Sequence, residues 1–196
     1  FAEGWMQLSN KMFGFNKIRK PIVAVSMAPT RSPWGGASPF VLQFEAMMQR
    51  RGWRVQYSLQ PTPDVVLVID PRLDHPKKKF GLEELRVFRK AHPKVPLLHR
   101  INECDQRKGT NDIDELLRQT SEISDYTVFI AEWLRDYFAA KWFDSSRPHS
   151  CIYNGADPGV YHPFGTRLPK SEEPLRIVTH HWSDNPLKGF DIYESV

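Results

Sequence analysis

The sequence has few cysteines, no long apolar run and no dense block of one charge, and each of these absences excludes a class of protein. Cys104 and Cys151 are its 2 cysteines, with no CxxC pair and no histidines at ligand spacing, so a disulfide scaffold or zinc knuckle is not indicated. No apolar stretch approaches the ~18 residues that a membrane-spanning helix needs. The opening residues lack the apolar segment of a secretion signal. These features predict a cytoplasmic protein with reduced thiols.

The charge and composition are those of a folded protein with a mild positive balance. Lys and Arg number 27 against 23 Asp and Glu, which gives a net charge of +4. This balance favours anionic partners, but the basic residues are scattered and form no nucleic-acid motif, so we expect no nucleic-acid partner. With 40% hydrophobic and 26% charged residues, the chain can bury a packed core.

Short aliphatic runs alternate with amphipathic segments along most of the chain. The runs lack a period of two, which is typical of strands buried on both faces of a parallel sheet. Amphipathic stripes between them predict helices. This alternation predicts a Rossmann-like, doubly wound α/β sheet with right-handed crossovers. The expected strands are 22–27, 54–58, 65–69, 95–98, 126–130 and 150–153, and the expected helices are 40–48, 82–91, 113–123 and 134–142.

The domain organisation follows from a break in this pattern. Residues 163–174 contain three prolines, a glycine and mixed charges, and they predict a linker between an α/β domain at 21–162 and the first β–α unit of a second, truncated domain at 175–196. An N-terminal arm at 1–20 precedes them. Because the chain begins with Phe and stops inside a predicted helix, we expect it to be a fragment. The arm has apolar residues at helical spacing followed by basic ones, so peripheral membrane contact is an alternative to a role in covering the domain.

The loop after the first strand is the first candidate site. Gly35 and Gly36 precede a predicted helix, for which Ser38 is the expected cap and Pro39 the expected first residue. In an open α/β sheet this is the carboxyl edge, where ligands bind. Backbone N–H groups and the positive helix end favour a phosphate there, and glycine lets it approach closely. A plain turn is the alternative.

A second candidate, His99–Gly109, leaves the fourth predicted strand at the same edge. A solvated loop accounts for its later residues, but His99 and Arg100 directly follow an apolar pair, and ionisable groups at a sheet edge are site candidates. We expect an acceptor or phosphate role for at least one of Arg100, Asn102 and Glu103. Lys188 is at the start of a predicted helix in the second domain, where the helix dipole disfavours a positive charge unless an anion binds beside it. An exposed lysine is the alternative.

The segment at 111–115 has two interpretations. Asp112-Ile113-Asp114 matches the D-x-D motif of metal-dependent sugar transferases. It also starts an amphipathic helix, where acidic residues simply favour the positive end. We expect Asp112 or Asn111 to cap this helix, with Glu115 completing a capping box, and no metal site.

The order of these features resembles a known family over about residues 21 to 196. The sequence is similar to the retaining, nucleotide-sugar-dependent glycosyltransferases of family four, which have the two-domain GT-B fold. The matching segments are Gly35-Gly36, Arg100–Asp105, Val128–Leu134, Tyr153–Asp157 with the later Pro163, and Lys188–Asp191.

The resemblance implies a sugar-transfer enzyme of glycan biosynthesis that uses no bound metal and no cofactor, because the nucleotide sugar is its substrate. Gly35, Gly36 and Lys188 would contact the donor diphosphate. The first domain would hold a glycan, lipid-linked or protein-glycan acceptor at Arg100, Asn102 and Glu103. The catalytic residue is not identified; His99 and Glu103 are candidates. The family often has an arginine where His181-Trp182-Ser183 stands here, and its paired glutamates fall beyond Val196.

Two other functions remain open at this point. One is a non-catalytic glycan- or nucleotide-binding module with the same fold, since a fold does not determine function. The other is a single-domain flavodoxin-like protein with a tail. If the resemblance is correct, the 196-residue chain should show no transfer activity by itself, because the rest of the donor-binding domain is needed to complete the site.

Overall fold

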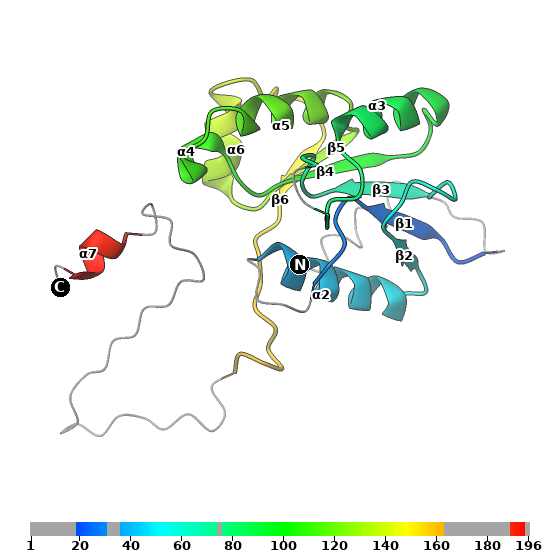
Figure 1. Ribbon diagram of the computed structural model, residues 1–196, viewed down its shortest axis with the longest axis horizontal. Coiled ribbons are helices and arrows are strands. Elements are labelled where there is room, and N and C mark those ends of the chain that lie inside the picture. The colour runs from blue at the N-terminus through cyan, green and yellow to red at the C-terminus, as the bar shows by residue number, and fades with distance from the viewer. Residues whose placement is uncertain (1–18, 31–35, 74–75, 163–188, 195–196) are drawn as a thin grey trace. The chain divides into compact units, whose positions relative to one another are not determined.

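The computed structural model describes residues 19–30, 36–73, 76–162 and 189–194 (Figure 1). The chain divides into two compact units, Phe1–Tyr153 and Asn154–Val196. The expected linker, the first strand of the second domain, Gly35, Lys188 and most of the N-terminal arm lie outside the described residues.

The first unit contains a six-stranded, all-parallel sheet, which confirms the predicted Rossmann-like α/β fold. The strand order is β2-β1-β3-β4-β5-β6. In register, Ala24 pairs with Val66 and Arg100 with Val128. The strands are β1 (Ile22–Val25), β2 (Arg54–Gln56), β3 (Val65–Val68), β4 (Leu97–Ile101), β5 (Tyr126–Phe129) and β6 (His149–Cys151).

Helices cover both faces of this sheet (Figure 1). Helix α2 (Ala37–Arg50) lies on one face, and α3 (Leu82–Ala91), α5 (Ile113–Glu122) and α6 (Glu132–Ala139) lie on the other. The chain moves across the sheet in one direction from β1 to β2 and in the opposite direction from β3 to β6. Right-handed crossovers therefore place α2 on one face and the later helices on the other. The direction reverses between β1 and β3, which is the switch point where such sheets bind ligands.

The core follows from the side-chain alternation of strands. On the face toward α2, Leu98 of β4 packs with Val41 and Phe44 of that helix. On the opposite face, Leu97 packs with Leu85 of α3, and another buried cluster joins Ile101 to α5 and α6. Residues of opposite parity in β4 therefore point to opposite layers.

Two predicted boundaries were wrong. Strand β4 continues to Ile101, so His99 and Arg100 lie inside the strand rather than in the following loop, and both are buried. Helix α2 begins at Ala37 with Gly36 as its N-cap. The Ser38 hydroxyl instead accepts a hydrogen bond from the Thr30 amide at 3.2 Å. Pro39 is the third helical residue, where the missing N–H has no partner in the helix.

The predicted cap of α5 was also wrong. Asp112 occupies the N-cap position but makes no side-chain cap bond. The carboxylate of Asp105, from the short helix α4 (Asp105–Lys108), accepts hydrogen bonds from the Ile113 and Asp114 amides at 3.0 Å each. Asp105, which lies before the turn between α4 and α5, thus caps α5 in place of Asp112.

In the second unit, the described residues form a turn and a short helix. The turn is closed by the Asp157 carboxylate, which accepts a hydrogen bond from the Gly159 amide at 2.8 Å. Helix α7 (Phe190–Glu194) follows Gly189, whose φ of +80° favours glycine. No helix within the described ranges has the length and apolar character needed to cross a membrane.

Candidate anion site at the carboxyl edge

The N-terminus of α2 is open at Gly36. This helix has 14 residues, no acidic residue in its first turn and no side-chain cap bond at Gly36, so no side chain of this described turn offsets the positive end of the helix. The backbone at Gly36 has φ −74°, which any residue can adopt. A Cβ added there would meet nothing within 4 Å. Neither conformation nor packing against the described residues requires glycine here, which leaves room for a ligand to approach the backbone.

A buried positive charge lies beside the same helix. Arg100 is only 2% exposed, and its guanidinium carbon is 3.9 Å from the ring centroid of Phe40 in the first turn of α2. Burial lowers the pKa of Arg100 to about 10, so the side chain is still charged at neutral pH. A helix N-terminus and a fixed guanidinium together favour an anion.

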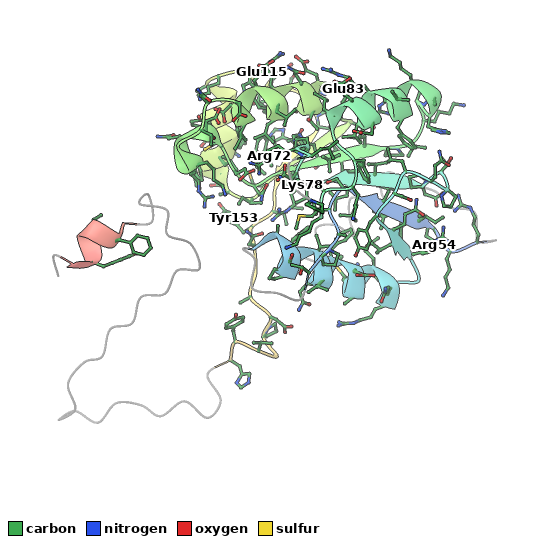
Figure 2. All side chains as sticks on the ribbon, viewed as in Figure 1. Arg54, Arg72, Lys78, Glu83, Glu115 and Tyr153 are labelled. Atoms are coloured by element: carbon green, nitrogen blue, oxygen red, sulfur yellow. The ribbon has the colours of Figure 1, made fainter. Side chains whose placement is uncertain are left out.

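Glu103, two residues beyond β4, belongs to an ion-pair network. Its carboxylate pairs with Arg72 and, at 3.2 Å, with Lys108. Arg72 also pairs with Asp70 at 2.7 Å, and Lys78 pairs with Asp70 at 2.8 Å. Figure 2 shows Arg72 and Lys78 near each other in the first unit. Among the described residues, this network joins three cations to two carboxylates.

The network also determines how Asp70 ionises. Burial alone would raise the pKa of Asp70, but hydrogen bonds from Arg72 and Lys78 outweigh it and hold the pKa below its usual range. Asp70 is therefore ionised at neutral pH and holds the Arg72 guanidinium through two hydrogen bonds, at 2.9 and 2.7 Å.

The switch point between β1 and β3 is covered by the chain itself. Met27 forms an antiparallel bridge with Lys78. The Ala28 amide donates to the Lys77 carbonyl at 2.8 Å, and the Ser26 hydroxyl accepts from the Ile69 amide at 2.9 Å. We therefore place the candidate site at the Gly36 end of α2 rather than directly over β1 and β3.

His99 faces away from Arg100. Its parity in β4 matches Leu97 and Ile101, which pack on the α3, α5 and α6 side. Its ring is 0% exposed, and among the described residues neither ring nitrogen has a hydrogen-bond partner. Burial lowers the pKa of His99 to about 3, despite the nearby charge of Asp70. His99 is neutral at pH 7, and in this conformation no solvent reaches it.

The structure thus divides the predicted site residues into groups. Gly36 and Arg100 flank the first turn of α2, and Asn102 is half-buried with the strand parity of Arg100. Glu103 belongs to the ion-pair network and His99 to the core of the opposite face. Gly35 and Lys188 lie outside the described residues.

Sequence reasoning missed Phe40, Arg72 and Lys78. Phe40 was read only as a core position. The two cations follow β3, but a polar loop residue carries no sequence signal of which carboxylate it will pair with. Among the described residues, no group of three or more His, Cys, Asp or Glu side chains is placed to hold a metal ion.

Comparison of the chain with protein-family models, with curated proteins and with solved structures found no match. The fold is established as an α/β unit with a Rossmann-like parallel sheet. Because this fold serves many functions, a function has to be argued from the site.

Proposed function

We propose that this chain is the acceptor-side domain, with the start of the donor-side domain, of a retaining glycosyltransferase that uses a nucleotide sugar. The observation that carries the proposal is the pairing of the open N-terminus at Gly36 with the buried Arg100 guanidinium on Phe40. The resemblance of the motifs to glycosyltransferase family four supplies the reaction class.

Each group has a role in this proposal. When the sugar–phosphate bond breaks, negative charge develops on the departing diphosphate. The backbone amides at Gly36 and the Arg100 guanidinium stabilise that charge from the first unit, because preorganised donors need no rearrangement as charge develops. Asn102 and Glu103 contact the acceptor hydroxyls.

Binding of nucleoside diphosphates tests the proposal directly. The isotope-labelled 196-residue chain is titrated with UDP, GDP and ADP, with uridine as the control that lacks phosphate. We expect the diphosphates, and not uridine, to shift the NMR resonances of the Gly36 amide and the Arg100 Nε–H. Arg100→Gln should weaken binding by about tenfold or more, because a charge-assisted hydrogen bond contributes about 1.5–3 kcal/mol.

Arg54→Gln is the matched control. Arg54 is an exposed arginine at the start of β2 and so lies at the amino edge of the parallel sheet, opposite to the carboxyl edge that holds the proposed site, and its replacement should leave diphosphate binding unchanged. Diphosphate shifts that avoid Gly36 and Arg100, or equal affinity after Arg100→Gln, would remove the assignment. Turnover of a nucleotide sugar by this chain alone would contradict the expectation that the site needs the rest of a second domain.

A further inference from the structure

An exposed tryptophan lies at another point of the same edge. Trp133 is in the first turn of α6, directly after the carboxyl end of β5. Its side chain is 47% exposed, whereas the neighbouring Leu134 is fully buried and anchors the helix. The indole is therefore held on a rigid element and shows part of its surface to solvent.

A cation from α4 lies beside this indole. The guanidinium carbon of Arg107 is 5.8 Å from the Trp133 ring centroid, at the outer limit of a cation–π contact. Arg107 is exposed, and no described carboxylate pairs with it.

The two carboxylates nearest to Arg107 along the chain have other partners, and Glu132, the residue before Trp133, is exposed. Glu103 pairs with Arg72 and Lys108. The Asp105 carboxylate accepts bonds from two amides at the start of α5 and from the Thr110 hydroxyl at 2.5 Å. Neither Glu103 nor Asp105 therefore pairs with Arg107.

We propose that Arg107 and Trp133 form an acceptor subsite for a pyranose ring that carries a phosphate or carboxylate group. The C–H face of the ring packs on the exposed indole. The anionic group pairs with the guanidinium, whose planar donors match a carboxylate or phosphate.

The position of this corner fits an acceptor rather than a donor. Helix α6, which carries Trp133, covers the sheet face opposite to α2, whose N-cap is Gly36 (Figure 1). A diphosphate at Gly36 and a saccharide at Trp133 would therefore occupy separate places. The subsite rests on the proposed function only in treating its ligand as the acceptor.

Four small probes separate the contributions of ring and charge. Glucose 6-phosphate, glucuronate, glucose and inorganic phosphate are titrated into the labelled 196-residue chain. The indole N–H resonance of Trp133 is identified by its loss in Trp133→Phe. We expect the two anionic sugars to shift this resonance and to bind at least about tenfold more tightly than glucose or phosphate alone.

Single substitutions should remove one contribution each. Trp133→Ala should reduce glucose 6-phosphate affinity to that of phosphate, and Arg107→Gln should reduce it to that of glucose. Arg54→Gln, away from the corner, should change neither. Equal affinity for phosphate and glucose 6-phosphate, or full affinity in either corner variant, would overturn the subsite.

The same chemistry could come from a soluble glycan or a lipid-linked one. A second experiment compares binding of glucuronate with binding of phosphatidylcholine vesicles that contain glucuronosyl diacylglycerol. Tighter binding to the vesicles indicates a lipid-linked acceptor, and equal binding indicates a soluble one. Binding to neither overturns the proposal. Failure here with intact diphosphate binding at Gly36 would leave the proposed function standing. Loss of diphosphate binding alone would remove the proposed function and leave a sugar-binding corner.

Discussion

Replacing Arg100 by methionine should stabilise the first unit while removing anion binding. Burial lowers the pKa of Arg100 to about 10, and because each tenfold change in protonation corresponds to about 1.4 kcal/mol, burying the charge costs on the order of 3 kcal/mol. The contact with Phe40, together with the other interactions of this guanidinium, returns about 1–2 kcal/mol. Methionine fills similar space and keeps a favourable contact with the ring. We expect a net gain of about 1–2 kcal/mol.

Urea unfolding followed by circular dichroism measures this gain as a higher midpoint at unchanged slope. Arg54→Met, at an exposed position of β2, is the matched control and should stay within about 0.5 kcal/mol of the parent. A loss of stability of more than about 1 kcal/mol in Arg100→Met would refute the reasoning, because it would mean that the buried charge is kept for structure rather than for a ligand.

Three further changes probe other parts of the account. The pKa of Asp70 is depressed in the folded state. Its contribution to stability is therefore present above its unfolded pKa of about 3.9 and is lost as the pH falls through the lower folded value. Asp70→Asn should therefore flatten the loss of stability that urea unfolding measures from pH 5 to 3. Gly81→Ala should lower the free energy of unfolding, measured by thermal unfolding, by about 1–3 kcal/mol, because the new Cβ would lie 2.6 Å from the Pro71 carbonyl oxygen. Gly36→Ala, whose Cβ would meet nothing within 4 Å, should lower it by less than about 0.5 kcal/mol. Asp105→Ala should cost about 1–2 kcal/mol in the same assay by uncapping α5, and an equal cost in Asp112→Ala would contradict the cap assignment.

Much of the fold was predictable because its signals are local. The aliphatic runs of β1 and β3 are buried on both faces, and the apolar stripe of α3 at Leu82, Leu85 and Phe88 faces the core. Such patterns depend only on neighbouring residues, so one sequence reveals them.

The errors involve contacts between residues that are distant along the chain. Strand β4 was ended too early because His99 and Arg100 are polar, and the packing that buries them comes from α2 on one face and the other helices on the opposite face. Asp105 caps α5 from eight residues before Ile113, whereas the sequence rules for helix caps consider only residues next to the helix start. The ion pair of Arg72 with Glu103 joins the loops after two different strands, and the sequence of either loop gives no sign of its partner in the other.

The claim that Gly36 and Arg100 hold a diphosphate is tested most directly by a crystal structure of the chain with UDP or GDP bound. The account predicts phosphate oxygens within hydrogen-bond distance of the amides at Gly36 and Ala37 and of the Arg100 guanidinium. A diphosphate seated on Arg72 and Lys78 instead, with the start of α2 bare, would contradict it.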